Sequence, residues 1–138
     1  MRVLEGFGDL NQSARDSLER LLSDPEDLDR RCRAALLDPG LTCGDGSGGE
    51  GAELYVRHHL SELNGLAARL GIDSPKNPGA AAIERFLGVM SVRSIWTAGD
   101  DDGGFLHVDY TIDAGRTDYV LCVVLDREGV IQRVEMES

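Results

Sequence analysis

The sequence predicts an α+β fold, in which N-terminal helices pack on a C-terminal four-stranded antiparallel meander sheet, with room for a short extra N-terminal strand. Apolar residues recur at helical spacing before Gly88 and with period two after it. The links between the expected strands are too short to hold crossover helices. With 138 residues, 41% of them hydrophobic and 28% charged, the chain has the size and composition of one globular domain. We therefore expect residues 1–138 to form a single α+β domain.

Two helices are expected near the N-terminus, after a short strand within residues 3–10. Residues 13–23 carry leucines at helical spacing. The next helix begins at Asp24-Pro25, an N-cap residue followed by a proline at the first helical position, and Pro39-Gly40 ends it. Residues 42–51 (TCGDGSGGEG) contain nothing to bury, so we expect a flexible glycine-rich loop there.

Two further helices are expected before the sheet. The longer one covers residues 52–70, with Gly71 as the residue just after its end. The Asn64-Gly65 pair inside this segment is a point at which the helix can break. The shorter helix begins at Asn77-Pro78 and ends at Gly88.

Four strands are expected after Gly88, each bounded by short turn sequences rich in glycine and aspartate. They cover residues 89–98, 105–112, 118–126 and 130–137. Links this short permit hairpins, so neighbouring strands should run antiparallel.

The third of these strands is apolar at every position from Tyr119 to Leu125, which is typical of a strand covered on both faces. If Leu125 pairs with Val130, then Val123 faces Gln132 across the last hairpin. The other face then holds Val120, Cys122, Val124 and Ile131 beside Arg133 and Glu135. Either the N-terminal helices or another subunit must cover these apolar groups, and the sequence leaves both alternatives open.

The charge of the chain argues against one class of function. There are 25 acidic and 14 basic residues, and the formal net charge of −11 disfavours general binding to DNA or RNA. No apolar run approaches the ~20 residues needed to cross a bilayer, and residues 1–10 lack the apolar core of a signal peptide. The three cysteines are widely spaced, which favours a reducing, cytoplasmic location.

The strongest candidate for a partner-binding site is a group of aspartates in the C-terminal half. Three of them share one predicted turn, and clustered exposed charge speeds association with a basic partner. A solvated hairpin turn explains the same three residues without any partner. The residues that we expect to contact a basic protein partner are Asp100, Asp101, Asp102, Asp109 and Asp113.

A small-ligand or metal site, with or without enzymatic activity, is the alternative. His58 and Glu62 stand one helical turn apart, and His107 and Asp109 share one face of a strand. The four residues form one site only if that helix lies across that strand face. The sequence contains no metal-binding or nucleophile motif, so we expect no metal, no cofactor and no catalytic residue.

The chain, mainly its C-terminal half, resembles a bacterial family of small α+β proteins known as a domain of unknown function, number two thousand and four. The similar segments are residues 7–10 (FGDL), 105–112 (FLHVDYTI), 117–126 (TDYVLCVVLD), 129–130 (GV) and 136–138 (MES). The resemblance implies a small cytoplasmic protein with no established activity, and some similar proteins sit in toxin–immunity gene neighbourhoods. That family supplies no functional residues to carry over.

Together these observations predict a non-enzymatic, acidic protein-interaction module, of an immunity-like or regulatory kind, that binds a basic protein partner. A homodimer formed through the sheet is a third alternative. We expect neither nucleic acid nor membrane among its partners.

Overall fold

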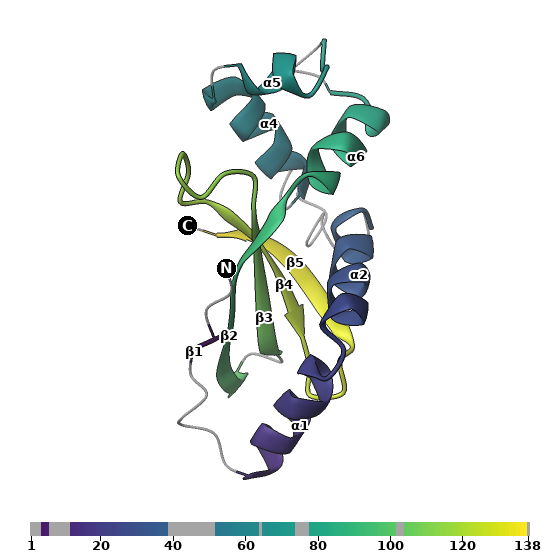
Figure 1. Ribbon diagram of the computed structural model, residues 1–138, viewed down its shortest axis with the longest axis vertical. Helices are drawn as coiled ribbons and strands as arrows, with labels where there is room; N and C mark the ends of the chain where they lie inside the picture. The colour runs from purple at the N-terminus through teal and green to yellow at the C-terminus, as the bar shows by residue number, and fades with distance from the viewer. Residues whose placement is uncertain are drawn as a thin grey trace.

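The computed structural model contains a five-stranded sheet with helices packed against it (Figure 1). It describes residues 4–5, 12–38, 52–63, 65–73, 78–101 and 104–137. The helices precede an antiparallel C-terminal sheet in the chain, which is the α+β arrangement that the sequence predicts. The predicted glycine-rich loop, residues 42–51, lies outside the described residues. Among the helices that the structure describes, none has the length and hydropathy of a bilayer-spanning segment.

The first two helices form where the sequence predicts them. They are α1, Gln12–Leu22, and α2, Pro25–Leu36. Asp24 caps α2, because its side chain accepts a hydrogen bond of 3.1 Å from the backbone N–H of Asp27. Both helices bury an apolar stripe in the main hydrophobic core. The predicted stop at Pro39-Gly40 lies outside the described residues.

The segment predicted as one long helix is divided in two. Its parts are α4, Ala52–Glu62, and α5, Leu66–Arg69. The break occurs at Gly65, whose φ of 81° is a left-handed conformation that a helix interior does not accept. Gly71, with φ of 71°, ends α5, and the N–H of the next residue bonds back to Ala67 O at 2.8 Å. The last helix, α6, covers Ala80–Gly88.

The sheet has the strand order β1-β2-β3-β4-β5. Strands β2 to β5 form the predicted antiparallel meander, and the short β1 adds to the edge of β2 in parallel. The strands are β1, Leu4–Glu5; β2, Ser91–Asp101; β3, Gly104–Thr111; β4, Val120–Leu125; and β5, Ile131–Glu137. The extra N-terminal strand is therefore present.

Strand β4 is buried at all six positions, as its apolar sequence predicts. The predicted register of the last hairpin is wrong by two residues, because Val123 pairs with Val134 and not with Gln132. Asp126 and Val130 close the turn through a backbone bond of 3.0 Å, and Gly129 has φ of 83°. Beyond the turn, a bulge inserts one extra residue into β5, so that Ile131 pairs with Leu125.

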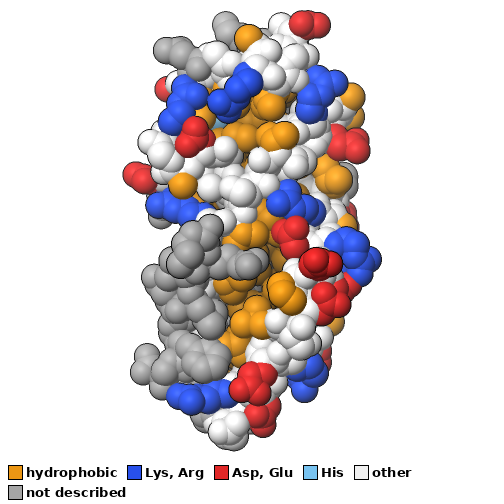
Figure 2. Space-filling view, in the orientation of Figure 1, with side chains coloured by type: hydrophobic (Ala, Val, Ile, Leu, Met, Phe, Trp, Pro, Cys, Tyr) orange, Lys and Arg blue, Asp and Glu red, His pale blue; other side chains and the backbone are white. Residues whose placement is uncertain are grey.

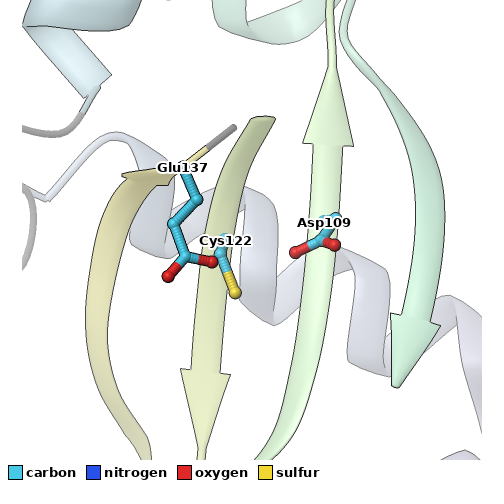
Figure 3. Close-up of side chains that lie close together, drawn as sticks. All are labelled: Asp109, Cys122 and Glu137. Carbon is cyan, nitrogen blue, oxygen red and sulfur yellow. The ribbon is translucent and has the colours of Figure 1, made fainter. Parts of the chain in front are cut away.

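The alternation of side chains divides the sheet into two faces. One face packs against the helices, and we call it the core face. Its members in β2 to β5 include Ile95, Leu106, Val108, Tyr110, Leu121, Val123, Leu125 and Val134. The opposite face carries the intervening residues, which point away from the helices behind the sheet (Figure 3). The described helices thus lie on the core face and not on the face that carries Val120, Cys122 and Val124, for which the sequence left the helices or another subunit as alternatives.

A carboxylate and thiol cluster on the polar face as candidate functional site

Polar and charged side chains gather on the face of the sheet that points away from the helices, which we call the polar face. Strand pairing places two rows across strands β2 to β5. One row is Ser94, Asp109, Cys122 and Glu135, and the adjacent row is Trp96, His107, Val124 and Arg133. Glu137 follows Glu135 on β5 and pairs with Val120. The site is therefore built on rigid strands rather than on loops.

Asp109 is held in place through one of its two carboxylate oxygens. Its Oδ2 accepts hydrogen bonds from Ser94 Oγ at 2.9 Å and from Trp96 Nε1 at 3.0 Å. Its Oδ1 is buried and has no hydrogen-bond partner. A buried carboxylate oxygen without a partner is costly. The orientation of this side chain is thus fixed, and one acceptor oxygen is left unsatisfied.

Cys122 lies between two carboxylates, those of Asp109 and Glu137 (Figure 3). One ligand atom from each of the three side chains lies within 4.8 Å of the others. Cys122 has no exposed surface. Burial raises the pKa of its thiol well above the ordinary value, and the nearby Asp109 carboxylate raises it further. In the free protein the thiol is therefore protonated and unreactive.

His107 also lies beside the Cys122 thiol. Its Nδ1 lies 3.6 Å from Cys122 Sγ, and its ring stacks on Trp96 with the centroids 3.8 Å apart. Burial lowers the pKa of His107 below its usual value, although Asp109 acts in the opposite direction. The imidazole is therefore neutral near pH 7 and does not balance the charge of the carboxylates.

Two glutamates on β5 increase the negative charge of the cluster. Glu137 is exposed, but partial desolvation of its carboxyl group raises its pKa, and Glu135 and Asp109 raise it further through hydrogen bonding and repulsion. Arg133 Nε donates to Glu135, which places one cation beside the group. The three carboxylates Asp109, Glu135 and Glu137 thus share a small area in which their charges are only partly balanced.

Of the aspartates predicted to bind a partner, those whose side chains the structure describes do not gather around Asp109. Asp100 and Asp101 lie at the end of β2, where only the backbone is described, and Asp102 lies outside the described residues. Asp113 follows β3, where its side chain accepts a hydrogen bond from Gly115 N at 3.0 Å. Asp113 therefore stabilises a turn, whereas Asp109 belongs to the polar face.

The four residues of the alternative metal site are separated. His58 lies on α4, where its ring contacts Tyr119 just before β4, while His107 pairs with Val124 near the other end of that strand. The helix does not lie across the strand face that carries His107 and Asp109. Within the described part of the chain, the one group of three metal-ligating side chains is Asp109, Cys122 and Glu137.

Sequence reasoning found Asp109 but missed its neighbours. Cys122 reads as a small core hydrophobe because it lies inside an apolar run. Glu135 and Glu137 read as ordinary polar positions of the last predicted strand. The signal that could have found them is the alternation of side chains along each strand, because Asp109, Cys122 and Glu135 lie on one face once the hairpins are paired.

Comparison with known proteins adds no relative: no protein-family model, no curated protein and no solved structure matches this chain. The resemblance to the family of unknown function described above therefore stays a prediction.

Proposed function

We propose that this protein is a non-enzymatic interaction module that binds a basic protein partner through the acidic part of its polar face. The observation that carries the proposal is the convergence of three carboxylates, those of Asp109 on β3 and of Glu135 and Glu137 on β5, on the two strands that flank β4. An immunity-like or regulatory role fits such a module, because both act by occupying a partner's surface.

The electrostatics of the cluster favour a cationic ligand. Like charges held on a rigid sheet repel one another, and an arginine or lysine side chain from a partner would relieve that repulsion. The formal net charge of −11 would also steer a basic protein toward this surface. Trp96, half-buried beside Asp109, offers the kind of aromatic group that is enriched in interfaces.

A homodimer through the polar face is the weaker alternative. It would bring two copies of the same carboxylate cluster together, and like charges across an interface cost several kcal/mol. The edge strand β5 also carries Arg133, Glu135 and Glu137, and charged residues on an edge oppose pairing with a second sheet.

The test compares two double variants that remove the same charge. Glu135→Gln with Glu137→Gln changes the polar face, whereas Glu62→Gln with Glu128→Gln changes exposed positions elsewhere. Each pair takes the formal net charge from −11 to −9, since two acidic residues are lost. The partner is captured from the native cell with the wild-type protein, and its association rate is then measured over a range of salt concentrations.

We expect the polar-face variant to associate about tenfold more slowly at low salt and to show a weaker salt dependence. The control variant should keep nearly the wild-type rate. Equal rates for the two variants would contradict the proposal. An Asp100→Asn, Asp101→Asn, Asp102→Asn triple variant in the same assay shows whether the end of the β2–β3 hairpin also contacts the partner.

A further inference from the structure

We propose that Asp109, Cys122 and Glu137 bind one divalent transition-metal ion of the Zn²⁺ type on the polar face. This inference goes beyond the interaction function, since it needs no protein partner. The site draws one ligand from each of the strands β3, β4 and β5 (Figure 3). It shares only Asp109 with the metal site that the sequence offered as an alternative.

The distances allow one ion to contact all three side chains. The ligand atoms lie within 4.8 Å of one another. Zinc bonds of roughly 2.0–2.3 Å in tetrahedral geometry place neighbouring ligand atoms about 3.6 Å apart. The ligand atoms therefore have to approach one another by up to about 1.2 Å. Glu137 is exposed at the end of an edge strand, so its flexible side chain can make most of this movement.

The unsatisfied oxygen of Asp109 is the second observation that points to a ligand. Its Oδ1 is buried without a hydrogen-bond partner, while Ser94 and Trp96 hold Oδ2. This is the arrangement of a ligating carboxylate, in which outer groups fix one oxygen and the other faces the ion. A bound cation would remove the cost of leaving Oδ1 without a partner.

The ligand types select the class of metal. One thiolate and two carboxylates suit a borderline ion such as Zn²⁺ or Co²⁺, whereas Ca²⁺ and Mg²⁺ require more oxygen ligands and avoid sulfur. When the metal–sulfur bond forms, the thiol proton of Cys122 passes to water, and the positive ion replaces it beside the carboxylates. The fourth coordination position is left to a water molecule.

The proposal is tested by titrating Co²⁺ into untagged, chelator-treated full-length protein. A thiolate ligand gives Co²⁺ a near-ultraviolet charge-transfer band, so the band reports directly on sulfur coordination. We expect saturation at one ion per chain, and competition by Zn²⁺ should remove the band. If no band appears, or if Ca²⁺ but not Zn²⁺ binds, the proposal is wrong.

The chain contains matched cysteine controls. Cys122→Ser should abolish the band, whereas Cys32→Ser and Cys43→Ser should keep it. Cys32 is the closest control, because it is equally buried and burial raises its pKa to about 12, yet it lies on α2 in the hydrophobic core, beside Tyr110. Loss of the band in a folded Cys32→Ser or Cys43→Ser protein, or its retention in Cys122→Ser, would refute the assignment.

Glu137→Gln covers the case in which Cys122→Ser does not fold. The Glu137 side chain is exposed, so the circular dichroism spectrum of Glu137→Gln should match that of the wild type. Its affinity for Co²⁺ should fall at least tenfold. Unchanged affinity in this folded variant would rule out the three-residue site. Cys122→Ser also separates this inference from the proposed function, because it removes the thiol and leaves all three carboxylates available to a basic partner.

Discussion

The two faces of the sheet use the same strands but place their buried residues in different surroundings. On β4, Val123 packs in the hydrophobic core beneath the helices, with Val108 and Val134 as its strand partners. The next residue, Val124, is just as well buried, yet its strand partners are His107 and Arg133. The comparison shows that an apolar strand need not lie between two hydrophobic layers, because one of its faces can support a polar cluster.

Figure 2 shows one face of the molecule, in the same orientation as Figure 1. Charged side chains of both signs are spread over much of it, and apolar side chains show between them along the middle of the molecule (Figure 2). The carboxylate cluster differs from this mixed surface because its acidic groups share one small area and its thiol is fully buried.

The largest expected effect comes from breaking the turn that sorts side chains onto the two faces. Gly129→Ala should lower the free energy of unfolding by about 2–3 kcal/mol, because φ is 83° and the new Cβ would lie 2.8 Å from Leu21 Cδ2, so the end of that side chain would have to move. Gly65→Ala is the control, since φ is 81° there but no atom lies within 4 Å of the new Cβ. Gly65→Ala should lower the free energy of unfolding by only about 1–2 kcal/mol, and urea denaturation measures both variants.

If the two glycine variants are equally stable, the contact between the β4–β5 turn and α1 contributes nothing measurable. The register of the hairpin would then depend on strand pairing alone.

An intermediate effect should separate the two faces directly. Val123→Ala should lower the free energy of unfolding by about 2 kcal/mol, because helices and strands enclose the cavity that it leaves. Val124→Ala should cost about 1 kcal/mol, since the side chains of His107 and Arg133 can move into the space. Both variants are compared by urea denaturation under identical conditions. A larger loss for Val124→Ala would show that the polar face is the more rigidly packed of the two.

The smallest expected effect is a pH dependence of stability that comes from His59 on α4. His59 is buried, with Nδ1 2.7 Å from Tyr55 O and Nε2 2.8 Å from Thr117 Oγ1, an environment that suits the neutral ring. Burial lowers its pKa below the ordinary 6.5. Below that pH the unfolded chain binds more protons than the folded one, so this contribution to stability is complete above pH 6.5 and is lost as the pH falls.

Urea midpoints measured between pH 7.5 and pH 5 for the wild type and His59→Gln test this prediction, as the variant should show the weaker pH dependence. Parallel curves for the two proteins would assign the effect to other groups.

Much of the fold follows from local sequence. The Asp24-Pro25 cap, the glycines after the helices and the period-two strands locate most elements to within a few residues. The register of the last hairpin was missed, because it depends on a left-handed Gly129 and a bulge that alternation does not reveal. The break at Gly65 was visible only as an alternative, since a glycine inside a helical pattern is often tolerated.

The candidate site was predicted only in part. The sequence predicts Asp109 as a site residue, but groups it with aspartates that are near it in sequence. Its structural neighbours, Cys122 and Glu137, come from strands that follow it in the chain. Cys122 carried no signal of its own, because a cysteine in an apolar run looks like any small core residue.

The sequence by itself determined the class of fold, the order of the elements and the apolar character of β4, because these depend on local periodicity and short links. Only the tertiary structure decided which side of β4 the helices occupy and which polar groups meet on the other side. The physical reason is that a side chain's neighbours across a sheet are fixed by register and by the packing of distant helices, and neither is encoded in any one segment.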